Sequence, residues 1–512
     1  MWKDTLHPKL WGMGLVLVLL ISACRSTTVN PTPVQTLASP PYQLTEKVLP
    51  SESDLTSILK RMVDEEKRAT GMVVGMIAKD EKVIAGYGSL NEPGGPIPDG
   101  DSLFEIGSIS KVFIGTLLAD AVRRGEVNLE DPASLYLPPT VRMPAYDGNS
   151  ITLLDLVTHT SGLPKEISAD QELTPENWVA EAYDFLSSYE LTYEPGTKFV
   201  YSNIGMTVLA HILELRTGMD YTQLLMERIL QPLKMTSTGF EPLPVMTPRL
   251  ATGHNSVMHP IDTYVYRVPD HVYVGGIISS AEDMLRFASA AMDLEPSPLL
   301  PAFQEAVKPQ RFGFNGKTGL AWLMTQGSYP IVYHNGHTLG MHAYFGFDPN
   351  RKIAVIVLAN AAVPLDDIGP HLLYPSRYAL ERFTPRVLGT PVPVDPDILA
   401  SYTGKYQFED MALEIMASRD QLVLSIPDEK PFTLLPESNT RFVIIEYEAS
   451  IRFLIDDGKV IGLLLDQAGA SQIFTFKKVM PGEYSPVRRT ILSTRIVENS
   501  PADGGVFDCR RL

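Results

Sequence analysis

Strand-like segments lie early and late in the central part of this chain, and mostly helical sequence separates them. Residues 72–78 and 83–88 are apolar runs joined by a polar turn, which is typical of paired strands. Further strand-like runs follow at 320–324, 343–347 and 353–358. The segment 108–237 lies between the early and late strands, and its apolar residues recur mostly at the spacing of a helix. Because strands must pair with one another, this order predicts an α+β fold in which both ends of the segment close one sheet around an inserted helical region.

A change in composition after residue 385 indicates a second domain. Residues 386–396 are rich in proline and are predicted to be a linker. Short alternating apolar segments, separated by turns, then run through 397–480, which predicts a small all-β barrel or sandwich. Residues 481–512 lack periodicity and are predicted to be a loose tail. The domain before the linker would span residues 49–385.

An apolar run from Trp11 to Ala23 precedes Cys24. The run is too short to span a bilayer comfortably and has the size of a signal-peptide core. Small residues before a cysteine resemble a bacterial lipobox, so we expect residues 1–23 to be a lipoprotein signal peptide and Cys24 to be lipidated. An ordinary signal or anchor with an incidental cysteine is the alternative. Residues 24–48 contain Pro, Ser and Thr and would tether the protein, outside the cytoplasm, to a bacterial membrane.

The chain is acidic, with 43 Lys and Arg against 60 Asp and Glu and a net charge of −17. This balance argues against a nucleic-acid partner and for an acidic, soluble surface. The chain has two cysteines. If Cys24 is lipidated, Cys509 has no disulfide partner, so the chain is not a disulfide scaffold.

Ser108 and Lys111 form the first candidate catalytic pair. A serine hydroxyl is a poor nucleophile until a base takes its proton. Residues three apart share one face of a helix, and a lysine in a dry pocket can lose its charge and act as that base. The alternative makes Ser108 a helix cap and Lys111 a solvated charge. The same spacing recurs at Ser57 and Lys60, where the surrounding residues predict an ordinary amphipathic helix.

The helix after Ser108 has apolar residues at helical spacing, which predicts that one of its sides is buried. These residues are Ile109, Val112, Phe113 and Leu117. Ser108 would then lie at the helix N-terminus, where backbone N–H groups favour developing negative charge.

Tyr201 and Asn203 form the second motif, after a Pro-Gly turn and a short strand-like segment. A phenol can shuttle a proton when cations lie near it, and an amide can both donate and accept hydrogen bonds. A core tyrosine beside a turn asparagine is the alternative.

The third motif contains His334, Gly336 and His337 and precedes a predicted strand. A glycine on an edge strand would let a substrate backbone approach closely, and the N–H of His337 could then face Ser108. A competing interpretation takes His334, His337 and His342 as metal ligands, although their spacing matches no established zinc pattern.

With the three motifs in this order, residues 50–385 resemble the serine β-lactamase and penicillin-binding superfamily, whose signature is S-x-x-K, S-D-N and K-T-G. The resemblance is greatest to the class C β-lactamase-related branch of esterases, D-peptidases and D-aminopeptidases, in which Y-x-N replaces S-D-N. The resemblance is supported by three further segments, at residues 131–137, 158–163 and 275–284. It implies an α/β sandwich of the β-lactamase/transpeptidase type, with an antiparallel sheet flanked by helices. It implies no metal or organic cofactor.

The resemblance also implies roles for the first two motifs. Ser108 would attack the substrate carbonyl, and Lys111 and Tyr201 would share the transfer of its proton. Asn203 would hold a substrate amide or orient Lys111. Water would then release the acyl group.

The third motif departs from the family pattern. A literal K-T-G begins at Lys317, but its surroundings resemble the family's glycine-rich segment, so we expect the segment from His334 to take the third place. The N–H of His337, next to Gly336, would join that of Ser108 in stabilising the oxyanion. His334 would tune the Tyr201 proton or bind a polar end of the substrate. A lysine is a permanent cation for a substrate carboxylate, whereas a histidine is only partly charged at neutral pH, which weakens the case for a β-lactamase or a carboxypeptidase.

The expected function is therefore a serine hydrolase that acts through an acyl-enzyme on esters, amides or peptides, with D-amino-acid peptidases and esterases among the candidates. A lipoprotein that recognises penicillin without turnover, or with a single turnover, is the alternative, as a cell-wall sensor or an assembly component. The expected partners are a small-molecule or peptide substrate and, through the lipidated N-terminus, a membrane.

Overall fold

The computed structural model describes residues 49–479 with internal gaps. The gaps are at 93, 168–176, 242–243, 256–257, 259, 262–271, 314–315, 362, 384–391, 409–410, 419–420, 426–430, 445–448, 457 and 468–472. The predicted signal peptide, the lipidation site at Cys24, the tether and the C-terminal tail lie outside the described residues. Within the described part of the chain, no helix combines the length and the apolar composition that a membrane crossing requires.

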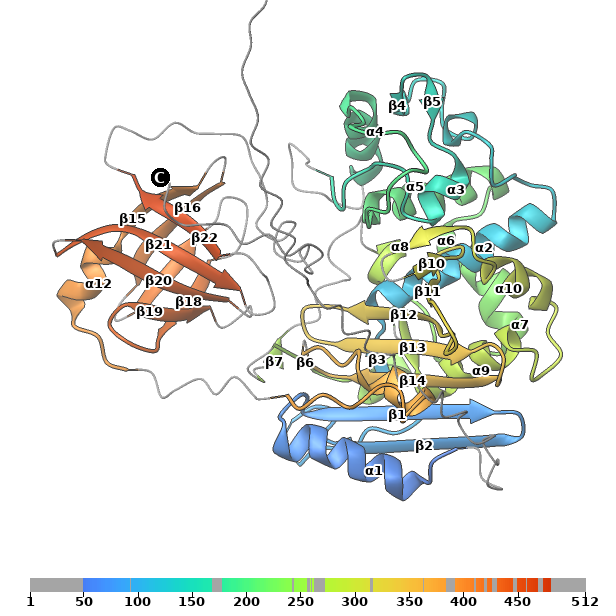
Figure 1. Cartoon of the computed structure of the whole chain (residues 1–512), viewed down its shortest axis with the longest axis horizontal. Coiled ribbons are helices and arrows are strands. Elements are labelled where there is room, and N and C mark those ends of the chain that lie inside the picture. Colours follow the sequence, from blue (N-terminus) through green and yellow to red (C-terminus); the bar gives the residue numbers. More distant parts are fainter. Residues whose placement is uncertain are drawn as a thin grey trace, which may run out of the picture. The chain divides into compact units, whose positions relative to one another are not determined.

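An eight-stranded antiparallel sheet forms the centre of the larger domain, in the order β2-β1-β14-β13-β12-β11-β10-β9 (Figure 1). Its strands are β1 (Gly71–Ala78), β2 (Glu81–Gly88), β9 (Arg311–Gly313), β10 (Gly316–Thr318), β11 (Leu323–Thr325), β12 (Val332–His337), β13 (His342–Asp348) and β14 (Ile353–Ala359). The early strand β1 pairs with the late strand β14, with Val74 opposite Val357. The prediction that both ends of the segment close one sheet is confirmed.

Helices cover both faces of this sheet, so successive residues of a central strand enter two different apolar cores. On β1, Val73 belongs to one core, whereas Met72 and Val74 belong to the other. Residues of α9 (Ala281–Ala291) lie in the first core. The second contains residues of α1 (Glu52–Lys60) and α11 (Ile368–Leu373). The predicted α/β sandwich is therefore confirmed.

The inserted region between β2 and β9 is largely helical, as predicted. Its helices are α2 (Ser110–Arg123), α3 (Leu153–Val157), α4 (Trp178–Ser188), α5 (Asn203–Thr217), α6 (Tyr221–Leu225), α7 (Gln231–Leu233), α8 (Val272–Gly275), α9 and α10 (Leu300–Ala306). Short strands pair β3 (Leu103–Glu105) with β8 (Ile278–Ser280), β4 (Ala145–Tyr146) with β5 (Asn149–Ser150), and β6 (Gly253–His254) with β7 (Pro260–Ile261).

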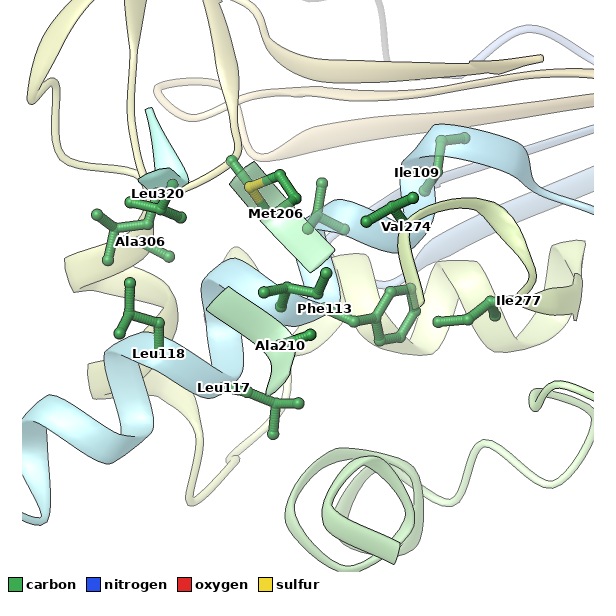
Figure 2. Close-up of a cluster of buried hydrophobic side chains, with 14 of the residues drawn as sticks. Ile109, Phe113, Leu117, Leu118, Met206, Ala210, Val274, Ile277, Ala306 and Leu320 are labelled. Carbon is green, nitrogen blue, oxygen red and sulfur yellow. The ribbon is translucent and has the colours of Figure 1, made fainter. Parts of the chain in front are cut away.

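Helix α2 is buried on all sides, not on one side as its apolar spacing predicts. Every residue from Ser110 to Ala121 is buried. Side chains from several elements surround it, including Met206 and Ala210 of α5 (Figure 2). The sequence pattern underestimates this burial because α5, α8 and α10, which pack against α2, are distant from it in sequence.

The C-terminal domain is a closed barrel, the first of the two predicted possibilities. Helix α12 (Pro396–Tyr402) precedes its eight strands. These are β15 (Gly404–Phe408), β16 (Met411–Ser418), β17 (Gln421–Ser425), β18 (Phe432–Pro436), β19 (Arg441–Ile444), β20 (Ala449–Asp456), β21 (Lys459–Gln467) and β22 (Ile473–Lys478). The barrel closes where β15 pairs with β22. Tyr402 stacks on Phe453 in its core, with ring centroids 3.8 Å apart.

The end of β12 lies directly against the turn that precedes α2. A Cβ atom on Gly336 would lie 1.8 Å from the carbonyl oxygen of Ile106 and 3.2 Å from the backbone nitrogen of Ser108. A Cβ atom on Gly107 would lie 2.5 Å from the backbone nitrogen of His337. Only glycine allows the two backbones to approach this closely.

Gly336→Ala should therefore destabilise the protein, because its new methyl group meets backbone atoms that cannot rotate away. We expect a loss of about 1–3 kcal/mol of unfolding free energy, as for other overpacked sites. Gly239→Ala is the matched control, since nothing lies within 4 Å of its Cβ position. Urea unfolding of the two variants measures the difference, and equal midpoints would show that β12 does not press on the turn.

Candidate active site

Ser108 lies in a 3₁₀ turn (Gly107–Ile109) that leads directly into α2. Gly107 has a φ of +51°, which glycine adopts readily and other residues rarely do. This turn leaves Ser108 partly exposed, although its neighbours are buried. By contrast, Ser57 and Lys60 of α1 are both exposed, as expected for an ordinary amphipathic helix.

Lys111 lies on the first turn of α2, and its side chain forms a hydrogen bond with Ser108. Its Nζ donates to Ser108 Oγ at 3.0 Å and to the carbonyl oxygen of Val274 at 2.9 Å. Only 1% of Lys111 is exposed. Burial lowers its pKa from 10.5 to about 7, while the charge of Glu166 acts in the opposite direction. A substantial fraction of Lys111 is therefore neutral near pH 7 and can accept a proton.

Tyr201 also shares a hydrogen bond with Ser108. The Lys111 ammonium lies 5.1 Å from the centre of the Tyr201 ring. Burial raises the pKa of Tyr201 above its usual value, so the phenol is neutral in the resting site. Ser108, Lys111 and Tyr201 thus form the predicted cluster, with the serine hydroxyl in hydrogen-bond contact with both partners.

His159 fixes the position of Tyr201 and was not predicted as a site residue. Its ring stacks on Tyr201 with centroids 4.3 Å apart, and its Nδ1 accepts the N–H of Ser202 at 3.1 Å. It adopts a left-handed backbone conformation, with a φ of +58°. Burial lowers its pKa well below its ordinary value, so the ring is neutral. Residues 158–163 carried the family resemblance, but that stretch contains no signal for stacking on a distant tyrosine.

Asn203 begins α5, and its side chain faces a carboxylate that the sequence motifs do not reveal. Its Nδ2 donates to Glu166 Oε1 at 2.5 Å. Its Oδ1 is buried and has no hydrogen-bond partner among the described residues. Lys165, next to Glu166 in the sequence, is a cation whose charge lowers the pKa of Lys111. Glu166 lies in no recognisable motif, so only the folded chain places it in the site.

His334 lies on β12 and is 1% exposed. Its ring centroid is 6.5 Å from that of Tyr201. Its Nδ1 contacts the carbonyl oxygen of Asn335 at 2.6 Å, and its buried Nε2 has no partner in the described part of the chain. Burial, with the charge of Lys111, lowers the pKa of His334 to about 4. The ring is therefore neutral near pH 7, rather than partly charged as a free histidine would be.

His337, at the end of the same strand, has an exposed side chain, while its backbone nitrogen faces the Gly107 turn. His342 instead forms a hydrogen bond with Asp366, with 3.1 Å between Nε2 and Oδ1. Among the residues that the structure describes, no group of three His, Cys, Asp or Glu side chains is arranged to hold a metal ion.

Lys317 lies on β10, which β11 separates from β12 in the sheet. Its Nζ lies 4.0 Å from the centre of the Phe312 ring, and Phe312 is 72% exposed. The strand beside the Ser108 turn is β12, which carries His334 and Gly336. The literal K-T-G therefore lies on a different strand from the one that contacts the serine.

Glu105, on β3, is a buried acidic residue near the turn. It is 2% exposed and forms a hydrogen bond with Thr338, just after β12. Its Oε1 has no partner among the described residues. Burial raises the pKa of this carboxyl to about 7.

The folded protein therefore holds the Glu105 proton more tightly than an unfolded chain, in which the pKa is 4.5. The contribution of the protonated Glu105 carboxyl to the free energy of unfolding is fully present below pH 4.5 and is lost as the pH rises through about 7. Glu105→Gln cannot ionise, so it should lose less unfolding free energy between about pH 5 and pH 8 than the wild type, by roughly 1–3 kcal/mol. Urea unfolding at both pH values measures this difference, and parallel losses would contradict it.

Comparisons with known proteins match the larger domain of the chain. The family model described as Beta-lactamase matches residues 55–372. The D-alanyl-D-alanine-carboxypeptidase/endopeptidase AmpH of Escherichia coli (strain K12) is 33% identical over 310 residues, which cover 57% of this chain and 79% of that protein. The Beta-lactamase of Lysobacter lactamgenus is 25% identical over 343 residues, covering 59% and 85%. The solved structure of a Beta-lactamase/D-alanine Carboxypeptidase from Yersinia pestis, complexed with citrate, has a TM-score of 0.53 and 25% identity and covers 63% of this chain and 97% of that one.

Proposed function

Because the chain belongs to the β-lactamase family, we propose that it is a serine hydrolase in which Ser108 carries the acyl group. The observation that carries this proposal is the contact between Ser108 Oγ and the buried Lys111. A lysine with a pKa of about 7 can take the hydroxyl proton at neutral pH, which an exposed lysine cannot. Tyr201, which shares a hydrogen bond with the same hydroxyl, can relay the proton to the leaving group.

The reaction would proceed in two acyl transfers. Ser108 Oγ bonds to the substrate carbonyl carbon as its proton passes to neutral Lys111, directly or relayed by the Tyr201 hydroxyl, and the carbonyl oxygen becomes an oxyanion. The backbone N–H groups of Ser108 and His337 stabilise that charge, and loss of one such donor costs about 2.7–4 kcal/mol of barrier. The bond to the leaving group then breaks, and the leaving group takes the proton. Water then attacks the carbonyl carbon of the acyl-serine ester with the same proton transfers. The bond to Ser108 Oγ breaks, and the serine takes back its proton.

The proposed substrates are esters, amides and peptides. The names of the relatives from E. coli and Y. pestis include D-alanine carboxypeptidase activity, so peptides of D-alanine are the first candidates to assay. Asn203, two residues after Tyr201, and His334, whose ring centroid is 6.5 Å from that of Tyr201, would contact the substrate. We also propose, from the sequence around Cys24, that the enzyme acts outside the cytoplasm on a lipid anchor.

Ser108→Ala should abolish covalent labelling by a fluorophosphonate, because the reagent needs an activated serine oxygen. Gel fluorescence of the labelled protein measures this directly. Ser57→Ala is the matched control, since it changes the exposed serine of the second S-x-x-K pattern, and it should label like the wild type. Labelling that persists in Ser108→Ala would reject the assignment.

The rate of acylation should rise with pH through about 7, the pKa of Lys111, because only neutral lysine accepts the serine proton. Glu166 raises that pKa, so Glu166→Gln should move the midpoint of the profile to lower pH. Glu190→Gln, which changes an exposed carboxylate on the same domain, should leave the midpoint unchanged.

The measurement is kcat/KM for a p-nitrophenyl ester as a function of pH. A midpoint near the ordinary lysine value of 10.5 would show that Lys111 is not held in its low-pKa state. An unchanged midpoint in Glu166→Gln would show that the carboxylate does not act on the base.

A further inference from the structure

We propose that three hydrogen-bond acceptors beside Ser108, namely His334 Nε2, Asn203 Oδ1 and the Glu166 carboxylate, form a subsite that selects N–H donors of the substrate. The substrate class is then a peptide or amide that offers a carboxamide or a further peptide bond near the scissile carbonyl, in preference to a free carboxylate. This inference rests on the proposed function and specifies its substrate.

The tautomer of His334 follows from its contact with the backbone. A carbonyl oxygen can only accept a hydrogen bond, so the Nδ1 atom, 2.6 Å from the oxygen of Asn335, must carry the proton. In the neutral ring Nε2 is then an acceptor with a lone pair. That atom is buried and has no partner among the described residues, on a side chain that is 1% exposed. A buried acceptor of this kind favours a ligand that supplies an N–H.

The orientation of the Asn203 amide follows in the same way. The Glu166 carboxylate can only accept, so the Nδ2 atom of Asn203, at 2.5 Å, is the donor. The amide oxygen Oδ1 must then point away from Glu166. It too is buried and has no described partner. Asn203 therefore offers the substrate an acceptor, while its own donor is held by a residue outside the motifs.

The charges around these acceptors are mixed, and the charge of Asp366 acts on His334. Glu166 is the carboxylate, and its charge is felt by both Lys111 and Tyr201. Lys111 is held by Ser108 and by the carbonyl oxygen of Val274. Lys165, next to Glu166, is the second cation whose charge reaches Lys111. A free carboxylate could approach Lys165, so that residue provides the strongest test of the inference.

A substrate carboxylate would meet two lone pairs and a negative charge at these acceptors, which disfavours it. An amide N–H would fill an acceptor that is otherwise unpaired. Sites with buried polar groups discriminate strongly against partners that leave those groups unsatisfied. The position that holds a permanent cation in the K-T-G pattern is taken here by the neutral His334, and Lys317 lies on β10, two strands from β12.

The test measures how peptides slow the fluorophosphonate labelling of Ser108. The competitors are an N-acetylated dipeptide of D-alanine with a C-terminal carboxylate, its carboxamide and its methyl ester, which has neither the charge nor the extra N–H. We expect the carboxamide to protect Ser108 at a concentration at least about tenfold lower than the carboxylate, with the methyl ester between them. Equal protection, better protection by the carboxylate, or no protection by the carboxamide would overturn the subsite.

Variants distinguish substrate selection by these acceptors from selection by other charged side chains. Glu166→Gln and His334→Lys should each improve protection by the carboxylate relative to the methyl ester, because one removes a negative charge and the other adds a positive one. Lys317→Gln is the control and should change neither ratio. Should His334→Lys fail to fold, Glu166→Gln decides alone. A carboxylate preference in the wild type that disappears in Lys165→Gln would assign recognition to Lys165 and reject the acceptor subsite.

Failure of the proposed function has a different signature. In that case the wild type would not label at all, or Ser108→Ala would label equally well, before any peptide is added.

Discussion

The proposed chemistry of this protein depends on the burial of Lys111 beside Ser108. A lysine ammonium in water is strongly hydrated and stays charged at neutral pH. Here the whole first part of α2 is enclosed by apolar side chains, and the pKa of Lys111 is lowered to about 7. The inserted helices therefore do more than complete a core. They create the dry environment in which lysine can act as a base.

The sheet provides the second half of the site. Strand β12 reaches the Ser108 turn only because Gly336 and Gly107 allow the two backbones to meet. Its pairing with β13, which places Gly336 opposite Ala343, fixes the position of that contact. The turn before α2 and the end of β12 thus meet at Ser108 and His337, whose backbone N–H groups we propose to stabilise the oxyanion.

The features that the sequence predicts well are those that a local pattern determines. Continuous apolar runs indicate β1 and β14, and the motif around Ser108 distinguishes it from Ser57 because only one of the two precedes a strongly apolar helix. The features that it misses depend on contacts across the chain. Glu166 reaches Asn203 over 37 residues of sequence. The neutral state of His334 results from burial that no spacing rule reveals.

The most direct measurement is to identify the residue that carries the acyl group during turnover. The protein would be mixed with an activated ester, stopped in acid within the first turnover, digested and analysed by mass spectrometry. We expect the acyl mass on the peptide that contains Ser108, and its loss when Lys111 is replaced by methionine, which keeps the length of the buried side chain without a base. An acyl group on another residue, or one that forms equally fast in Lys111→Met, would show that Lys111 does not activate Ser108.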